Sequence, residues 1–306
     1  MTLLARLKPY VKLLLQWLIL SGVLFFLGRT LFRHWQDVAQ AVTQQSLAAI
    51  HWGYLGAALG VTAIAHLWLG AMWGLILRQL QQSVSLTWAI RVYLITNLAK
   101  YLPGNVWHFY GRVKATTAEQ GATGAIATLS VILESLLMAA AALGVAILSF
   151  PSDHWPLQGL ALVLILLAVQ PRWLNPLIRL ASRLKKTRQA PKKLLVYPLL
   201  PLAGEGIYIV LRAGGFLLTL AALNALTLQQ LPQLTSAFTL AWLLGFVLPG
   251  APGGVGVFEG TLIALLPPDW IAGELLVAIA LYRLISTLAE AIGAGGAWLN
   301  GRRFMS

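Results

Sequence analysis

Three long stretches without a charged side chain constrain this chain more than any other feature of its sequence. They cover residues 38–77, 154–171 and 213–258. A helix needs about 20 apolar residues to cross a hydrocarbon core of about 30 Å, so each stretch can hold at least one membrane span. Charged residues make up 10% of the 306 residues, whereas about 25% is usual in a soluble globule. The sequence therefore predicts an all-α polytopic membrane protein.

The net charge of +13 is explained by basic residues near the expected ends of the spans. Residues 171–193 carry eight Lys and Arg side chains and no acidic one. Cytoplasmic loops of membrane proteins collect Lys and Arg, so we expect this loop and both termini to face the cytoplasm of a bacterial cell, across its inner membrane. Because topology accounts for the charge, nucleic acid is not an expected partner.

The expected topology has about six full spans and two re-entrant helical hairpins. The hairpins are predicted at residues 86–116 and 234–266, where short apolar segments end at Pro-Gly turns. A segment of about 14 residues rises only about 21 Å, which is less than a full span. Full spans are expected at about residues 11–28, 52–77, 122–150, 194–226 and 271–299, with one more directly before the basic loop.

The two hairpins indicate an inverted repeat. Leu-Pro-Gly occurs at residues 102–104 and 248–250, each time after one full span and a short apolar helix. In the expected topology the first copy begins by crossing inwards and the second by crossing outwards, a pattern typical of secondary transporters with binding sites near the midplane. The alternative is that the two motifs are unrelated turns. The single transmembrane domain (1–306) then divides into a first span with an outer connector (1–50), repeat 1 (51–170), the basic loop (171–193) and repeat 2 (194–306).

Charged residues within the expected spans are the candidates for function. A charge near the bilayer centre costs on the order of 3 kcal/mol and is therefore rarely without a role. Glu205 and Arg212 are seven residues apart on one helix face, as are Arg283 and Glu290, so these two spans would be able to pair acid with base. Such pairs have a purely structural alternative, which is to hold two spans together. The candidates are Arg91, Arg112, Glu134, Glu205, Arg212, Glu259, Arg283 and Glu290.

The predicted central polar site combines Arg112, Glu259 and Arg283. Glu259 follows the second hairpin turn, and the repeat offset places Val113, the neighbour of Arg112, opposite it. Backbone amides exposed by glycines at a helix start would attract an anion. The alternative role of such glycines is to permit close helix packing. The glycines of this turn are Gly253, Gly254 and Gly256.

Residues 249–259 contain the pattern Pro-Gly-Gly-x-Gly-x-x-Glu and resemble the transmembrane region of lysylphosphatidylglycerol synthases. Residues 97–112, with a Pro-Gly turn followed by Gly111-Arg112, and the Tyr282-Arg283 pair are similar as well. The likeness extends over roughly residues 10–300. It implies a helical domain with re-entrant segments that moves an aminoacylated phospholipid between leaflets, and it matches charged family positions at Arg112, Glu259 and Arg283.

The chain also departs from that family. Family members often carry an acid–base pair in the span after the first hairpin, whereas Glu134 is followed by Ser135. Only residues 300–306 follow the last expected span, which leaves no room for a soluble aminoacyltransferase domain. Synthase activity is therefore not expected.

These features favour a lipid translocase with a central polar cavity. Two other functions stay open: an accessory membrane subunit of a separate synthase or transferase, and a membrane-embedded enzyme with Glu134 and Glu259 as acid and base. The chain has no cysteine and no P-loop or close histidine-ligand pattern, so we expect neither a metal nor another cofactor. Membrane lipids are the expected partners. An anionic lipid would suit the basic loop and Arg112, and an aminoacylated phospholipid would also suit Glu259.

Overall fold

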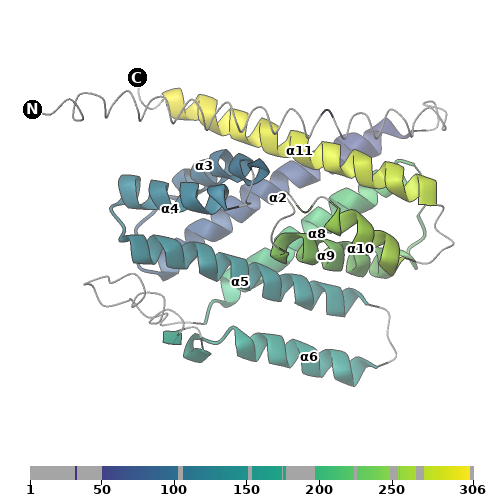
Figure 1. The fold of residues 1–306 in the computed structure, drawn as a ribbon, viewed down its shortest axis with the longest axis horizontal. Coiled ribbons are helices and arrows are strands. Elements are labelled where there is room, and N and C mark those ends of the chain that lie inside the picture. The colour runs from purple at the N-terminus through teal and green to yellow at the C-terminus, as the bar shows by residue number, and fades with distance from the viewer. Residues whose placement is uncertain are drawn as a thin grey trace, which may run out of the picture.

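A computed structural model describes most of the chain from residue 50 onwards. It covers Phe32 and residues 50–102, 106–150, 154–173, 175–176, 197–223, 226–248, 254, 256–266 and 272–303. Within these ranges the protein is all helical (Figure 1). The helices are α2 (Trp52–Gln79), α3 (Leu86–Asn97), the 3₁₀ helix η2 (Leu98–Tyr101), α4 (Trp107–Gln120), α5 (Gly124–Ser149), α6 (Trp155–Ala168), α8 (Leu199–Ala221), α9 (Leu231–Val247), α10 (Val257–Leu265) and α11 (Ala272–Arg303).

Four of these helices are long and apolar enough to cross a membrane: α2, α5, α8 and α11. They lie where the sequence predicts full spans at about 52–77, 122–150, 194–226 and 271–299. Where the sequence predicts a further full span directly before the basic loop, the helix α6 has 14 residues, which is about 21 Å of rise and shorter than a full span. The span expected at 11–28 lies outside the described residues. The prediction of an all-helical protein with apolar helices of membrane-spanning length is thus confirmed for the described residues.

Local sequence signals fix several helix ends. Ser85 caps α3 by accepting a hydrogen bond from the Trp88 amide, and Thr123 caps α5 in the same way. Helix α4 ends at Gly121, whose φ of 65° is the left-handed conformation that glycine adopts at a helix C-terminus. These signals account for α3 and α4 as two separate short helices between the long helices α2 and α5.

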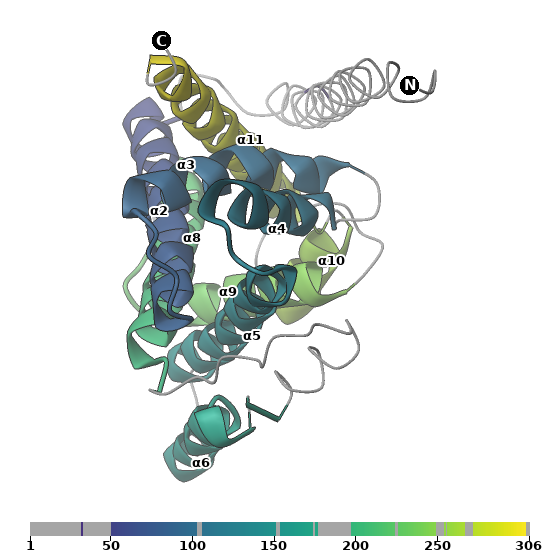
Figure 2. The same cartoon turned by 90° about the vertical axis from the view of Figure 1, so that its left-hand side faces the viewer.

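The described helices form two matching sets, α2–α5 and α8–α11. Each set has a long helix, a pair of short helices and a second long helix. The first long helices, α2 and α8, pack side by side (Figure 2). The last long helix of each set packs against the other set. Helix α11 packs on α2 and α3, whereas α5 packs on α8 and α9. Figures 1 and 2 both show α6 outermost, next to α5.

Aromatic side chains pack the interior of the second set. Phe216, Phe238, Phe258 and Tyr282 come from α8, α9, α10 and α11, and their ring centroids lie 5.2–6.4 Å apart. Such ring pairs contribute about 0.5–1.5 kcal/mol each beyond the area that they bury. This cluster fixes α10 against α11 and so determines where the charged residues of those helices meet.

Candidate functional site

A cavity of about 320 Å³ lies where the two sets of helices meet. Four basic side chains face it from four different helices: Lys100 of η2, Arg112 of α4, Arg212 of α8 and Arg283 of α11. The other lining residues are largely aromatic or hydroxylic, and they include Tyr93, Tyr101, Glu134, Tyr208, Trp242, Phe246, Gly254, Phe258, Tyr282, Ser286 and Thr287. The cavity therefore has a largely apolar wall that carries four basic groups, and it lies between short helices and helices that are long and apolar enough to span a membrane.

Arg112 and Glu134 form a buried ion pair in the cavity wall. The guanidinium donates directly to the carboxylate, and the two side chains are 3% and 1% exposed. The Arg112 guanidinium carbon also lies 4.5 Å from the centroid of the Tyr93 ring, a cation–π distance. The pair joins α4 to α5, directly after the first pair of short helices.

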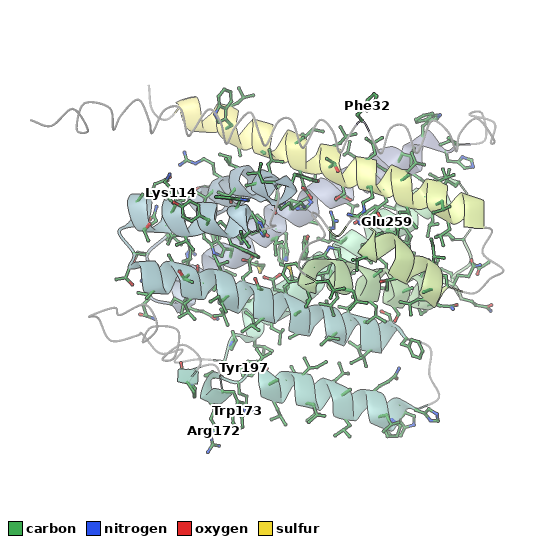
Figure 3. All side chains as sticks on the ribbon, in the orientation of Figure 1. Phe32, Lys114, Arg172, Trp173, Tyr197 and Glu259 are labelled. Carbon is green, nitrogen blue, oxygen red and sulfur yellow. The ribbon has the colours of Figure 1, made fainter. Side chains whose placement is uncertain are left out.

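Arg283 and Glu259 form a second ion pair after the second pair of short helices. Arg283 Nε lies 3.0 Å from Glu259 Oε1, and Arg283 Nη2 donates to the Gly254 carbonyl over 2.9 Å. The other Glu259 oxygen accepts from the Gly256 amide at 2.6 Å and so caps α10. Figure 3 shows Glu259 at the start of α10, whereas Arg172 and Trp173 lie at the edge of the molecule.

The two ion pairs occupy matching places with their charges exchanged. In the first set, a basic residue of the second short helix (α4) binds an acidic residue of the following long helix (α5). In the second set, the short helix (α10) supplies the acid and the long helix (α11) supplies the base. Each pair of short helices is therefore fixed to a long helix at the cavity by a charge pair.

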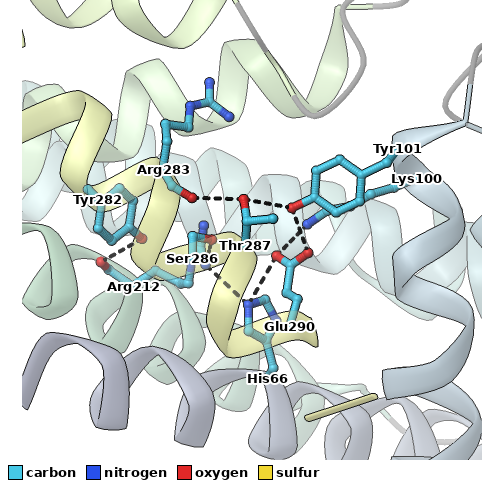
Figure 4. Close-up of polar contacts among 9 residues, drawn as sticks. All are labelled: His66, Lys100, Tyr101, Arg212, Tyr282, Arg283, Ser286, Thr287 and Glu290. Carbon is cyan, nitrogen blue, oxygen red and sulfur yellow. Dashed lines mark hydrogen bonds and ion pairs between the residues drawn. The ribbon is translucent and has the colours of Figure 1, made fainter. Parts of the chain in front are cut away.

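A third acidic group, Glu290, connects α11 with η2 and α2. Its carboxylate lies 2.5 Å from Lys100 Nζ, 3.1 Å from the Tyr101 hydroxyl and 3.2 Å from His66 Nε2 (Figure 4). Glu290 is 2% exposed and His66 is also 2% exposed. A buried carboxylate is stable in such a place only when several donors surround it, as they do here.

Arg212 differs from the other basic residues because its side-chain partners are neutral groups or histidine. Its Nη1 lies 2.7 Å from Ser286 Oγ and 3.2 Å from His66 Nε2. The Tyr282 ring lies 5.3 Å from the guanidinium carbon, and its hydroxyl donates to the Arg212 carbonyl (Figure 4). Arg212 is 7% exposed, and its Nε has no hydrogen-bond partner within the described part of the chain.

The structure brings together part of the predicted central site. Arg112 and Arg283 line the same cavity, and Glu259 joins it through Arg283. The sequence predicted that Glu205 and Arg212 would pair with Arg283 and Glu290 of the last span. These pairs are not observed. Arg283 binds Glu259 instead, and Glu290 binds Lys100 and His66, because these groups lie nearer to them.

Other predicted site residues lie apart from the cavity or outside the described ranges. Glu205 is fully buried on α8 and is not part of the cavity wall. Gly253 lies outside the described residues. Arg91 forms an exposed pair with Glu119, 3.4 Å away.

Sequence reasoning missed two residues of the Glu290 cluster, His66 and Lys100. A signal for each was present. His66 is a polar residue in the middle of an otherwise apolar span, and Lys100 comes two residues before the first Leu-Pro-Gly motif. Neither residue has an acidic neighbour in sequence, so their partner on α11 became visible only in the fold.

Gly254 supports the packing interpretation of the glycine turn. Its φ is 72°, and a Cβ placed on it would lie 3.1 Å from the Cα of Gly245. We therefore expect Gly254→Ala to lower the free energy of unfolding by about 1–3 kcal/mol, because alanine is strained at positive φ and α9 would have to move. Thermal unfolding of the detergent-purified protein would measure this.

Gly260→Ala is the matched control for that prediction. Gly260 lies within α10, and no heavy atom would be within 4 Å of an added Cβ. Alanine is the better helix former by about 0.5–1 kcal/mol, so this variant should be as stable as the wild type or more so. Equal melting of the two variants would show that the Gly245–Gly254 contact is unimportant.

No protein-family model matches the chain, and a search of curated proteins finds no match to it. A functional proposal therefore depends on the residues and geometry described above.

Proposed function

We propose that this protein is a lipid translocase that moves a phospholipid, or a lipid-linked polar group, across the membrane through the cavity. The observation that carries the proposal is a cavity of about 320 Å³ with four basic residues in its wall, in a chain with four helices long and apolar enough to cross a membrane. A cavity of this size lies within the range of about 300–1,000 Å³ that small-molecule sites occupy. It suits a headgroup better than two acyl chains, which would stay in the surrounding lipid.

The charges at the cavity support transport over a purely structural role. A single buried ion pair is enough to join two helices, yet Arg112–Glu134, Arg283–Glu259 and the Glu290 cluster all lie at or beside one cavity. Charged groups in membrane-spanning segments usually face a polar pathway, because they are costly in lipid. A polar pathway through the centre of the bundle is what a translocated headgroup requires.

The proposed topology is an inverted repeat with two re-entrant hairpins, formed by α3–α4 and α9–α10. Three features support it: the matching order of helices, the exchange of α5 and α11 between the two sets, and the two ion pairs with exchanged charges. We further propose about six full spans in the whole chain, with both termini in the cytoplasm of a bacterial cell. The resemblance to the transmembrane region of lysylphosphatidylglycerol synthases is consistent with this arrangement and is part of the proposal.

Translocation in proteoliposomes tests the proposed function. Purified protein would be reconstituted with headgroup-labelled phosphatidylglycerol or aminoacylated phosphatidylglycerol, and leaflet exchange measured by chemical quenching of the outer leaflet. We expect exchange well above that of empty vesicles. Glu259→Gln and Arg283→Gln should reduce it to the background rate, because each removes the ion pair that holds α10 at the cavity.

Arg91→Gln is the matched control for the transport assay. Like Arg283, Arg91 is an arginine within a segment that was expected to lie in the membrane. Its ion pair with Glu119 is exposed and lies away from the cavity, so exchange should be retained. Exchange no faster than in empty vesicles, with each lipid and with an imposed proton gradient, would contradict the translocase. That outcome would favour an accessory subunit, whose partner enzyme crosslinking would then identify.

A further inference from the structure

Among the described residues, one basic group at the cavity has no directly bonded acidic partner. Lys100 is matched by Glu290, Arg112 by Glu134 and Arg283 by Glu259. In the described part of the chain, Arg212 has no carboxylate within ion-pair distance. A buried guanidinium without a directly bonded counter-charge is unfavourable, and at a cavity it marks a place where an anion is stabilised.

Glu205 does not supply the missing charge. It lies seven residues before Arg212 on α8, about 10.5 Å along the helix axis, and it is absent from the cavity wall. Neither of its carboxylate oxygens has a hydrogen-bond partner among the described residues. The nearest acid on the same helix is therefore not bonded to Arg212.

His66 does not satisfy Arg212 either. The same nitrogen, Nε2, lies 3.2 Å from Arg212 Nη1 and 3.2 Å from Glu290 Oε1. An arginine only donates, so its bond requires Nε2 without a proton, whereas a carboxylate only accepts and requires Nε2 with one. One nitrogen cannot satisfy both partners at once. The bond to the carboxylate is the charge-assisted and stronger one, so His66 donates to Glu290.

Arg212 is then left with donors that have no acceptor. Among the residues described, Ser286 Oγ is the remaining side-chain acceptor, and Nε has none. Ser286 accepts from Arg212, so its own hydroxyl proton is available to a second acceptor. Both groups belong to the cavity wall. Guanidinium and hydroxyl donors side by side are the arrangement that binds the oxygens of a phosphate group.

We propose that Arg212 and Ser286 bind a phosphate oxyanion within the cavity. This deepens the proposed function, on which it depends for the source of the anion: the phosphodiester of a lipid headgroup. The chemistry is shared by a free phosphate, so the experiment must separate the two sources. The three paired basic residues also line the cavity around the headgroup.

Binding to the purified full-length protein in detergent tests this proposal without requiring transport. The probes are dihexanoylphosphatidylglycerol, glycerol 3-phosphate and inorganic phosphate, with dihexanoylglycerol as the phosphate-free lipid. Titration calorimetry gives each dissociation constant. We expect saturable binding of the phospholipid, no binding of dihexanoylglycerol, and a loss of affinity of about 10-fold or more in Arg212→Gln. Arg91→Gln should bind like the wild type.

Ser286→Ala provides a second variant, because it removes only a hydroxyl and should fold even if Arg212→Gln does not. We expect it to weaken phospholipid binding roughly 3- to 10-fold, the effect of one lost hydrogen bond. Arg212→Lys keeps the charge but loses the planar fork, and it should also bind more weakly. Unchanged affinity in all of these variants, or equal binding of dihexanoylglycerol, would overturn the proposal.

The remaining outcomes identify the source of the anion. Phosphate or glycerol 3-phosphate binding as tightly as the phospholipid, with the same dependence on Arg212, would support the oxyanion site but assign it to a soluble phosphate. Phospholipid binding without leaflet exchange would support the site and contradict the translocase. Leaflet exchange that is present in the wild type and unchanged in Arg212→Gln and Ser286→Ala would support the translocase and contradict the phosphate site.

Discussion

Glu290→Gln is expected to destabilise the folded protein by about 3–5 kcal/mol. Glutamine keeps the shape of the side chain but removes the charge that stabilises Lys100 Nζ, 2.5 Å away, and His66 Nε2, 3.2 Å away. Removing the acid of a buried charge cluster leaves its basic partners as uncompensated buried charges. Their cost is larger than the stability that the intact cluster contributes to the fold. Thermal unfolding in detergent, followed by the loss of helical circular dichroism, measures the effect.

Glu119→Gln is the matched control for Glu290→Gln. Glu119 also accepts from a basic residue, Arg91 at 3.4 Å, but their side chains are 46% and 34% exposed. Exposed pairs contribute about 0–1 kcal/mol, so this variant should melt close to the wild type. The double replacement Lys100→Met with Glu290→Met should recover part of the stability, because it removes both charges together. Equal melting of the Glu290→Gln and Glu119→Gln proteins would show that the cluster is unimportant for folding.

The long spans of the fold were predictable from sequence because hydropathy and length determine them directly. Helices α2, α5, α8 and α11 follow from apolar segments with few charges, and membrane insertion allows little else for such segments. The short helix α6 was less predictable. The uncharged stretch at 154–171 has 18 residues, but the helix covers Trp155–Ala168, which is 14 residues. Segment length in sequence thus overestimated helix length there.

The candidate site was predictable in its residue types but not in its pairing. Glu134, Glu259 and Arg283 stood out because each is a charge in an apolar segment, and Arg112 because it follows the first Pro-Gly turn. Which acid meets which base depends on how the helices pack. Spacing along one helix favoured a pairing between two long helices, whereas the observed pairs join each short helix to a long one. Periodicity within a helix places residues on a face but does not identify the neighbouring helix.

Arg112→Gln should abolish translocation and also destabilise the protein by about 3–5 kcal/mol. Glu134, which is 1% exposed, would lose its ion pair and remain buried as an uncompensated charge. The variant also removes a basic group from the cavity wall. Exchange of labelled phosphatidylglycerol in proteoliposomes and thermal unfolding of the same preparation measure the two effects separately.

The charge-swapped protein, Arg112→Glu with Glu134→Arg, separates the structural role of the pair from its role in transport. A buried pair stabilises the fold as long as opposite charges meet, so the swap should recover most of the melting temperature lost in Arg112→Gln. Translocation should stay near the background rate, because the positive charge would move from α4 to α5, and Tyr93 would lose its cation–π partner on the cavity wall. A swapped protein that melts normally and also translocates lipid would show that Arg112 acts only by holding α4 to α5. The basic character of the cavity would then have to come from Lys100, Arg212 and Arg283 alone, and the phosphate site at Arg212 would become the main determinant of which headgroups enter.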